Sequence, residues 1–573
     1  MFNVIIPAAG LGTRMHPLSR SLSKTLIPLN GKPILGWILD NFHSWKCYDD
    51  ISEIVIVANE SGDISRFIDT YSDLDIRKKI KVVSQRFDFN GPGGAILSGV
   101  SELTHPEEGL LIWLSDTISQ TDFSSYIEKG APFIATAKVP VETSSRWCVC
   151  VGDQLFQFLN KPSPDFFSGT NTLDALIGVY YMPSLAGTSA FSFSEYQEYK
   201  NSGLELNISY MLTNYRIDKQ LPFQIVDDTE QWCDTGELDS FYKTKAKLLT
   251  LGCRAQSTLR EEDGVIYKTG NTDNAREKIA KEKQWYLERK GFQKLFVPKL
   301  LDDKNDDNLA MEVCPGTALA DIVAYGNVPV QVMGKIILRA VEKYHENFID
   351  VAKGTHHPYF YLKLVNEFYW RRTIRRIAKN YDLYKSLSPD FELTDYITIM
   401  NYIADFCDDI TDSYETAHAN NGFTGHLINV KEEGAPNIHG DFHLGNILFD
   451  SLINKYTFLD PRGGTMYKSL VDSYYDIAKI YHDVYCGYFL ILKNLCKVEN
   501  GIVVFSDYYQ EYLNHFQKIL DNYLTSVYSY DMNLVRRLSV IQLLTCIPFH
   551  TDNINQCKLF LTRALNLIKG DAK

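Results

Sequence analysis

The sequence lacks the features that mark membrane, secreted and nucleic-acid-binding proteins. No run approaches the ~18 uninterrupted apolar residues of a membrane span, and residues 1–6 carry no basic segment ahead of their apolar stretch. Eleven cysteines, an odd number, lie between Cys47 and Cys557 without a C-x-x-C pair, which favours reduced thiols over a disulfide framework. The net charge of −13 argues against nucleic acid and anionic membranes as partners. We therefore expect a soluble, cytoplasmic protein that acts on small molecules.

The chain is long and apolar enough for several packed domains, with 573 residues of which 45% are hydrophobic and 13% aromatic. Up to residue 140, β-branched runs alternate with helix-like stretches, which predicts an α/β domain with a mostly parallel sheet and helices on both faces. These runs are residues 4–6, 54–57, 80–83, 110–114 and 133–137. After a boundary near 250–254, two strand-like runs around Asp263 and Gly264, a charged helix over 274–290 and a strand over 308–313 precede mostly helical periodicity. We expect domains at 1–250 and 255–573.

A glycine-rich turn follows the first predicted strand. Gly10 and Gly12 can adopt positive φ and allow backbone N–H groups to approach a phosphate, and Arg14 and Lys24 would add positive charge. The turn is neither a Walker A sequence nor a G-x-G-x-x-G fingerprint. Read from these residues alone, a phosphate-binding loop and an ordinary tight turn both remain open.

The longer pattern is more specific. It reads Gly10-Leu11-Gly12-Thr13-Arg14-Met15-x-Pro17-Leu18-Ser19-x-x-x-Ser23-Lys24. This pattern closely resembles the signature of the sugar-phosphate nucleotidyltransferases, the pyrophosphorylases that make NDP-sugars. It departs from that signature at Ser23, where the family usually has proline. Four downstream segments resemble the same family: Gly91-Pro92-Gly93-Gly94-Ala95, Ser115-Asp116, Asn160-Lys161-Pro162 and Trp232-Cys233-Asp234-Thr235-Gly236. The resemblance covers about residues 1–250 and implies a Rossmann-like nucleotidyltransferase fold.

The resemblance also implies roles for individual residues. Arg14 and Lys24 would be catalytic by neutralising the triphosphate, and Asp116 and Asp234 would hold Mg²⁺, which favours carboxylate oxygens. The attacking phosphate oxygen is already anionic, so this reaction needs charge neutralisation rather than a general base. An isolated Asp after a strand is otherwise most often a turn or cap residue. Sugar-phosphate binding would fall to Lys161 and Gly178, and nucleotide binding to Ala9, Gly10, Gly12, Thr13, Gln85, Gly91, Gly93 and Gly94.

A second constellation lies near the other end of the chain, in His439-Gly440-Asp441-Phe442-His443-Leu444-Gly445-Asn446 and in Asp460, fourteen residues further on. Phosphoryl transfer to a hydroxyl needs this set: Asp441 would orient the hydroxyl, while Asn446 and Asp460 would supply oxygens to Mg²⁺. His439 and His443 could be metal ligands. With no cysteine and no third histidine nearby, structural hydrogen bonding is favoured for both.

This segment closely resembles the aminoglycoside phosphotransferase and choline kinase group, relatives of the protein kinases. The resemblance implies an α+β protein-kinase-like fold with an N-lobe at about 255–316 and a C-lobe at about 317–573. Lys268 would grip the ATP phosphates and pair with Glu282, although Glu277 and Glu288 lie on the same predicted helix. Glu312 and Val313 would form the adenine-binding hinge, and Asp476 would be a structural anchor. The nucleotide loop, residues 252–264, lacks the G-x-G-x-x-G of protein kinases, as is common in this group.

Together these resemblances favour a bifunctional kinase and nucleotidyltransferase. ATP would phosphorylate a small hydroxylated acceptor, a sugar or amino alcohol, and a second NTP (CTP, UTP, dTTP or GTP) would convert the product to an NDP-linked precursor, with Mg²⁺ at both sites. A role in capsule or other surface glycan synthesis follows from what the two families commonly do. The sequence leaves open the acceptor, the NTP and the oligomeric state, with a homo-oligomer as one outcome because the N-terminal family often associates.

Three alternatives remain. The kinase-like domain could be a non-catalytic binding or regulatory module, the pair could be a choline kinase with a phosphocholine cytidylyltransferase, or the kinase could be an aminoglycoside-resistance enzyme. A cationic acceptor is compatible with the acidic residues Asp382, Asp390, Glu392, Asp395, Asp405, Asp408 and Asp409. A basic stripe at Arg371, Arg375 and Lys379, with Arg372 and Arg376 beside it, is favoured as a solvated helix face and receives no role.

Overall fold

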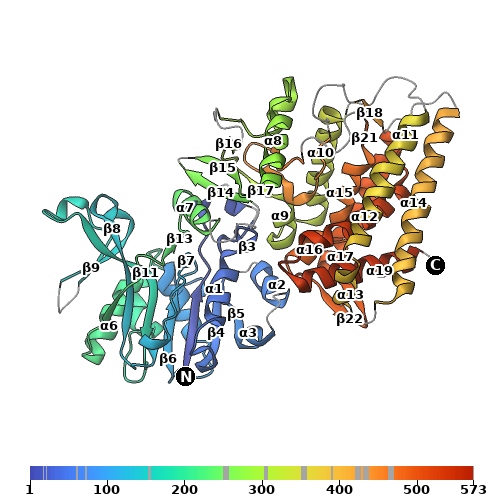
Figure 1. Cartoon of the computed structure of the whole chain (residues 1–573). Helices are drawn as coiled ribbons and strands as arrows, with labels where there is room; N and C mark the ends of the chain where they lie inside the picture. The colour runs from blue at the N-terminus through green and yellow to red at the C-terminus, as the bar shows by residue number, and fades with distance from the viewer. Residues whose placement is uncertain are drawn as a thin grey trace. The chain divides into compact units, whose positions relative to one another are not determined.

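The structure is a computed structural model. It describes residues 1–16, 18–20, 22–59, 62–70, 74–152, 157–249, 257–262, 264–301, 308–349, 358–388, 391–419, 427–429, 438–462 and 470–571. The chain divides into two compact units (Figure 1). The N-terminal unit comprises residues 1–248 with 325–327, and the C-terminal unit comprises residues 249–324 with 328–573.

Four parallel strands form the centre of the N-terminal unit. They lie in the order β6-β1-β4-β5, with β1 at Phe2–Pro7, β4 at Ile51–Ala58, β5 at Ile80–Ser84 and β6 at Gly109–Trp113. Every residue of β1 and β6 is buried, which explains why these strands are apolar runs without polar alternation. Four of the five predicted strands therefore belong to this parallel part of the sheet.

The same sheet continues with antiparallel pairs. β11 (Thr172–Met182) runs antiparallel to β6, to β8 (Phe133–Pro140) and to β9 (Cys148–Val151). β10 (Gln157–Asn160) pairs with β9, and β12 (Gln224–Asp227) runs parallel to β8. The run at 133–137 thus forms a strand with an antiparallel neighbour. A buried apolar run indicates that both faces are covered, but it carries no information on strand direction.

Helices cover both faces of this sheet. α4 (Gly91–Val100) and α6 (Ile208–Lys219) share a hydrophobic core with Ile5 and Ile112, whereas Phe42 of α1 (Ile34–His43) contacts Trp113, the next side chain along β6. Successive side chains of a strand point to opposite faces, so α1 lies on the other side. The remaining elements are α2 (Gly62–Thr70), α3 (Leu74–Lys79), α5 (Ser124–Ile127), α7 (Leu238–Leu249), β2 (Pro28–Leu29), β3 (Lys32–Pro33), β7 (Thr117–Ile118) and β13 (Cys233–Asp234).

The C-terminal unit begins with a three-stranded antiparallel sheet and one helix. The strands are β14 (Ser257–Glu262), β15 (Val265–Gly270) and β16 (Asn308–Glu312), and α8 (Asp273–Leu287) packs against β15 and β16. The side chain of Thr272 caps α8 by accepting a hydrogen bond from the N–H of Ala275 at 3.2 Å. The predicted charged helix and the strand after it are both present.

The rest of this unit is mainly helical, as Figure 1 shows in yellow to red. Its helices are α9 (Leu319–Tyr325), α10 (Val330–Phe348), α11 (Pro358–Leu364), a π-helical turn (Val365–Arg371), α12 (Arg372–Lys379), α13 (Tyr381–Leu387), α14 (Leu393–Ala419), α15 (Tyr474–Val484), α16 (Tyr488–Leu492), α17 (Asp507–Tyr528), α18 (Met532–Cys546) and α19 (Ile554–Asp571). Its short strands are β17 (Thr317–Ala318), β18 (Leu427–Asn429), β19 (Ile447–Asp450), β20 (Lys455–Phe458), β21 (Leu470–Asp472), β22 (Lys497–Glu499) and β23 (Ile502–Val504). None of the helices in the described ranges has both the length and the apolar character of a membrane-spanning segment.

Candidate active sites

In the N-terminal unit, the glycine-rich turn after β1 closes onto Lys24. Gly12 has φ +63°, and its carbonyl accepts a hydrogen bond from Ser19 Oγ at 2.7 Å. A Cβ placed on Gly12 would lie 3.1 Å from the Cβ of Lys24, so both the backbone conformation and the close approach favour glycine here. Thr13 and Arg14 follow in a short 3₁₀ turn. Pro17 of the predicted motif lies outside the described residues.

Backbone pairing brings the two predicted metal-binding carboxylates together. β7 and β13 are antiparallel, with Asp234 opposite Thr117, and the N–H of Thr235 donates to the carbonyl of Asp116 at 2.9 Å. A Cβ built on Gly236 would lie 2.9 Å from Asp234 Oδ1 and 3.5 Å from Asp116 Oδ2. Carboxylate oxygens that converge in this way suit a hard divalent cation such as Mg²⁺.

The charges around these carboxylates are unequal. Burial alone would raise the pKa of Asp116, but Lys24, whose Nζ donates to Asp116 Oδ2 at 2.7 Å, and Arg14 together lower that pKa below its ordinary value. Burial raises the pKa of Asp234, and the charge of Asp116 adds to this effect. A cation between the two side chains would therefore relieve a repulsion that Lys24 only partly offsets.

Arg146 is a neighbour of this site that the sequence patterns did not indicate. Its Nη2 lies 3.6 Å from Asp234 Oδ2 and forms an ion pair with Glu237. Arg146 stands in a 3₁₀ segment, residues 141–146, whose local sequence carries no motif. Only the fold brings this arginine to Asp234.

The second glycine-rich segment is shaped by packing within the chain. Gly93 donates its N–H to the carbonyl of Leu206 at 2.8 Å, and a Cβ on Gly93 would lie 2.6 Å from that carbonyl oxygen. A Cβ on Gly94 would lie 2.7 Å from the carbonyl of Phe89, and Gly91 has φ +80°. Gln85 braces the preceding loop because its Nε2 donates to Phe89 O at 2.7 Å. These glycines are needed by the fold whether or not a nucleobase packs on them.

Three other predicted residues occupy strained or braced backbone positions. Gly178 has φ +94° in β11, and a Cβ there would lie 2.7 Å from the Cβ of Leu114. Lys161 has φ +50° and donates its N–H to the carbonyl of Trp147 at 2.8 Å. Asn59 Nδ2 donates to the carbonyl of Ala9 at 2.6 Å, which fixes the start of the glycine-rich turn.

Residues 3–250 match a family model described as Nucleotidyl transferase. The N-terminal 250 residues are a nucleotidyltransferase domain. A UTP–glucose-1-phosphate uridylyltransferase of Synechocystis is 24% identical over 253 residues, which cover 42% of this chain and 61% of that protein. The enzyme of the same name from Escherichia coli is 34% identical over 86 residues, 15% of this chain and 27% of its own.

A solved structure of a UDP-glucose pyrophosphorylase complexed with UDP-glucose has 19% identity and a TM-score of 0.36, covering 43% of this chain and 98% of that one. The chain spans 52% of the length of a putative mannose-1-phosphate guanyltransferase from Sulfolobus acidocaldarius and 61% of the length of the Synechocystis enzyme. The residues that match the family model, 3–250, include nearly all of the first of the two units.

In the C-terminal unit, Lys268 joins two carboxylates that are far apart in the sequence. Its Nζ lies 2.6 Å from Glu282 Oε2 and 2.6 Å from Asp460 Oδ1. The other two glutamates of α8 and its end have different contacts: Glu277 pairs with Lys281 at 2.6 Å, and Glu288 Oε1 accepts from Gln284 Nε2 at 2.9 Å. Glu282 is therefore the partner of Lys268 in the folded chain.

The electrostatics of this triad follow from its burial. Burial raises the pKa of Glu282 to about 7, against the opposing effect of Lys268. The positive charge of Lys268 lowers the pKa of Asp460. Desolvation would lower the pKa of Lys268, but Asp460 and Glu282 outweigh it and raise that pKa above its ordinary value. Lys268 and Asp460 are consequently held in their charged forms.

The hairpin β19–β20 brings Asn446 beside Asp460. The N–H of Leu459 donates to the carbonyl of Asn446 at 2.9 Å, and Asn446 Nδ2 donates to the carbonyl of Asp441 at 3.0 Å. Asp460 has φ +54°, and its N–H donates to the hydroxyl of Tyr286 at 3.1 Å. An amide and a carboxylate on adjacent chain segments fit a Mg²⁺ site.

His439 and His443 have the structural hydrogen bonds that were favoured for them. Nδ1 of His439 accepts from the N–H of Asp441 at 3.3 Å, and Nδ1 of His443 accepts from the N–H of Gly445 at 3.1 Å. Burial lowers the pKa of each ring to about 4, so both are neutral acceptors near pH 7. Within the described residues, no group of three or more His, Cys, Asp and Glu side chains could hold a metal ion.

Asp441 is held by two cations that the motif did not predict. Lys479 Nζ lies 3.1 Å and Arg462 Nη2 3.4 Å from Asp441 Oδ1. Burial alone would raise the pKa of Asp441, but Arg462 and Lys479 hold it well below the ordinary value. Asp476 fixes the same loop by accepting the N–H groups of His439 at 2.7 Å and Gly440 at 2.8 Å, which is the anchoring role expected of it.

The predicted hinge lies at the end of β16. Glu312 Oε1 accepts from the N–H of Lys299 at 3.0 Å, and the N–H of Val313 donates to the carbonyl of Gly264 at 3.0 Å. The N–H of Val313 is therefore used within the chain. Residues 252–256 and 263 of the predicted nucleotide loop lie outside the described residues.

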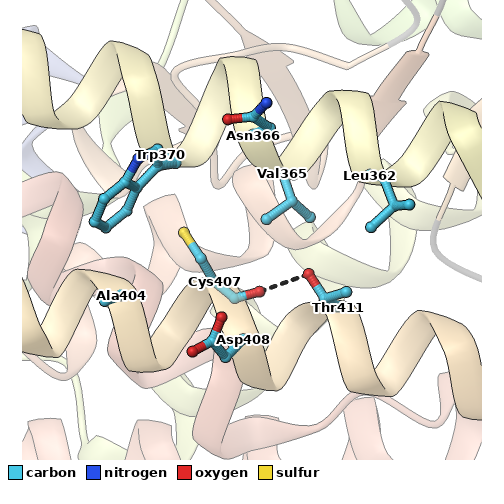
Figure 2. Close-up of a pocket in the computed structure, with 8 residues that line it drawn as sticks. All are labelled: Leu362, Val365, Asn366, Trp370, Ala404, Cys407, Asp408 and Thr411. Atoms are coloured by element: carbon cyan, nitrogen blue, oxygen red, sulfur yellow. Dashed lines mark hydrogen bonds between the residues drawn. The ribbon is translucent and has the colours of Figure 1, made fainter.

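A separate cavity of about 270 Å³ lies where α11 and the π-helical turn face α14 (Figure 2). Leu362, Val365, Asn366 and Trp370 line one side, and Ala404, Cys407, Asp408 and Thr411 line the other. Thr411 Oγ1 donates to the carbonyl of Cys407 at 2.7 Å. None of the predicted catalytic, nucleotide-binding or metal-binding residues lines this cavity.

Proposed function

We propose that the chain is a bifunctional enzyme that activates a small molecule in two steps. The C-terminal unit transfers the γ-phosphoryl group of ATP to a hydroxyl of the acceptor. The nucleotidyltransferase domain then transfers a nucleotidyl group from a second NTP to the phosphorylated product, releasing pyrophosphate and an NDP-linked precursor for a surface glycan. The observation that carries this proposal is the convergence of Asp116 and Asp234 beside Lys24 within a matched nucleotidyltransferase domain.

In the nucleotidyltransferase step, an oxygen of the phosphorylated acceptor attacks the α-phosphorus of the NTP. Arg14 and Lys24 neutralise the triphosphate, and Lys24 exchanges its contact with Asp116 for one with phosphate. Asp116 and Asp234 would hold Mg²⁺, which supplies charge neutralisation at the reacting phosphates. The names of the curated relatives support UTP and a sugar 1-phosphate as the first pair to test.

In the kinase step, Lys268 binds ATP phosphates while Asp441 orients the acceptor hydroxyl and receives its proton. Arg462 and Lys479 keep Asp441 ionised, so it is an acceptor of hydrogen bonds throughout the physiological pH range. Asn446 and Asp460 would hold Mg²⁺, which would neutralise charge on the phosphates. The bridge from Lys268 to Glu282 and Asp460 supports this role for the C-terminal unit. Because both units belong to one chain, the shared intermediate is formed at a high local concentration.

The test measures ADP and pyrophosphate separately with the full-length protein. The assays use ATP, each of CTP, UTP, dTTP and GTP, and a panel of free and phosphorylated acceptors. We expect Asp441→Ala to abolish ADP release and to abolish pyrophosphate release from the free acceptor, while pyrophosphate release from the phosphorylated acceptor is retained. Unchanged pyrophosphate release from the free acceptor in Asp441→Ala contradicts the two-step order. Absence of acceptor-dependent ADP release from the wild-type protein assigns the C-terminal unit to binding rather than catalysis.

A further inference from the structure

A cluster of cationic side chains surrounds Asp441 in the C-terminal unit. Arg462 and Lys479 contact the same carboxylate oxygen, Asp441 Oδ1, at 3.4 and 3.1 Å. Tyr475 precedes Lys479 by one helical turn of α15, so both side chains project from the same face of that helix. The guanidinium of Arg372 lies 6.0 Å from the ring centre of Tyr475. The cluster therefore joins α12, α15 and the segment after β20.

Arg372 is the member of this cluster with an unused hydrogen-bonding group. Its Nε is buried and has no hydrogen-bond partner among the described residues, while its guanidinium packs 4.5 Å from the ring centre of Phe368. A buried N–H of a charged group without a partner is costly, and native structures usually satisfy such groups with a ligand or ordered water when the chain does not. The basic stripe is thus divided: Arg371, Arg375 and Lys379 are exposed, whereas Arg372 and Arg376 are half-buried.

The positive charge of the cluster exceeds what its contacts neutralise. Arg376 donates to the carbonyl of Thr545 at 3.4 Å and packs over Phe549, so its contacts there are a carbonyl and a ring. Burial lowers the pKa of Arg376, and the charges of Arg372 and Arg462 lower it further. Burial would raise the pKa of Tyr475, but Arg372, Arg462 and Lys479 bring it down to about 8. The contributions of the neighbouring cations to the pKa values of Arg376 and Tyr475 indicate a positive potential beside Asp441.

Resting on the kinase function proposed above, we propose that the acceptor carries an anionic group, a carboxylate or a phosphate monoester, which binds to Arg372 beside Tyr475 and Arg462. The acceptor hydroxyl then lies at Asp441. A planar guanidinium with a free N–H suits either anion because both present paired oxygens. The substrate class is therefore hydroxylated acids, such as sugar acids, rather than amino alcohols or aminoglycosides, whose ammonium groups this potential would repel.

The acidic residues that made a cationic acceptor compatible with the sequence are exposed or paired with cations where the structure describes them. Asp405, Asp408 and Asp409 of α14 are exposed, and Asp409 pairs with Arg537. Asp395 pairs with Lys569 at 3.0 Å. Asp390 lies outside the described residues. These acidic side chains of α14, including Asp395, are thus exposed or paired, whereas the side chains that contact the carboxylate of Asp441 are the cations Arg462 and Lys479.

The experiment compares matched acceptors that differ in charge, using the full-length protein. The panel is glycerol, glycerate and glycerol 3-phosphate, then glucose, glucuronate and glucose 6-phosphate, with choline as the cationic member. We expect ADP release with an anionic member of a set, and the comparison of carboxylate with phosphate identifies the source of the charge. Equal or faster ADP release with glycerol, glucose or choline overturns the inference while leaving the kinase function intact.

Arg372→Gln tests the residue, and Arg375→Gln, an exposed arginine on the same helix, is the matched control. We expect Arg372→Gln to raise KM for the anionic acceptor about 10- to 100-fold, the loss of one or two charged hydrogen bonds, with KM for ATP unchanged. Arg372→Lys should recover part of the loss. An equal rise in KM for ATP and acceptor shows that the cations serve the ATP phosphates and overturns the inference.

A binding measurement separates failure of this inference from failure of the kinase function. Isothermal titration with glucuronate and with inorganic phosphate is performed on the wild type, Arg372→Gln and Arg375→Gln, after thermal unfolding has shown that all three are folded. Binding that Arg372→Gln abolishes, in a protein without acceptor-dependent ADP release, retains the anion site and rejects the kinase. Absence of both anion binding and ADP release with anionic acceptors rejects the anion site.

Discussion

In the nucleotidyltransferase domain, backbone pairing between β7 and β13 brings Asp116 and Asp234 together, whereas in the C-terminal unit a single side chain, Lys268, joins Glu282 to Asp460. The first arrangement is held by main-chain hydrogen bonds, which do not depend on the charge of the carboxylates. The second is held by ion pairs, so it depends on every partner remaining charged. The two sites thus differ in what keeps them assembled, and they should respond differently to the same kind of substitution.

The largest effects are expected from removing one carboxylate at each site. Asp234→Asn should lower pyrophosphate release about 100- to 1000-fold, and Asp460→Asn should lower ADP release by a similar factor, since each loses a charge that supports the transition state. Each variant should leave the other reaction unchanged when that reaction is supplied with its own substrate. Asp239→Asn and Asp405→Asn, at exposed positions, are the controls. A variant that lowers both reactions equally would show that the units are coupled.

The comparison is sharpened by removing the two lysines. Lys268→Met leaves Glu282 buried without its counter-charge, so we expect the C-terminal unit to lose about 1–3 kcal/mol in the free energy of unfolding as well as ADP release. Lys24→Met removes an ion pair from a site that the strands still hold, so pyrophosphate release should fall with little change in stability. Differential scanning calorimetry and the two product assays measure both effects. Equal stability losses for the two variants would contradict the difference between the sites.

A smaller effect separates glycines that the fold needs from glycines that a ligand needs. Gly93→Ala should destabilise the N-terminal unit by about 1–3 kcal/mol because its Cβ would meet the Leu206 carbonyl at 2.6 Å. Gly10 has open space around its Cβ position, so Gly10→Ala should leave the unfolding temperature unchanged and raise only KM for the NTP. Thermal unfolding and NTP kinetics test the pair. Equal effects of both substitutions on stability would refute this separation.

A pH dependence is expected for the stability of the C-terminal unit. Burial raises the pKa of Asp483 from 3.8 to about 7, so between these values the folded state retains a proton that the unfolded state has lost. The stabilising contribution is complete below this window and is lost as pH rises through it, with a slope of at most about 1.4 kcal/mol per pH unit. Asp483→Asn keeps an acceptor for the Leu444 N–H but does not titrate.

The unfolding temperature of the Asp483→Asn variant should therefore fall less between pH 5 and pH 8 than that of the wild type. Asp405→Asn, on the exposed face of α14, is the control. Parallel pH profiles for the wild type and Asp483→Asn would show that Asp483 does not retain its proton in the folded state.

Local motifs predicted the positions of the carboxylates but not their partners. The segments around Gly12, Asp116, Asp234 and Asp441 are recognisable because each is a short run with fixed spacing. Arg146 stands in a segment without such a pattern. Arg462 and Lys479 lie near the recognised residues Asp460 and Asp476, but no local spacing assigned them to Asp441. The choice of Glu282 over Glu277 and Glu288 was likewise open in the sequence because all three occur near the same helix. Distance to Lys268 decided it.

The sequence by itself determined the two-part organisation, the buried strands of the N-terminal sheet and the families that each half resembles, because these depend on composition, periodicity and local spacing. Tertiary structure decided the antiparallel extension of the sheet, the convergence of Asp116 with Asp234, and the cationic surroundings of Asp441. The physical reason is the separation along the chain over which each effect acts. Periodicity and turns act over a few residues, whereas the field at a carboxylate is the sum of charges that distant segments bring within a few ångströms.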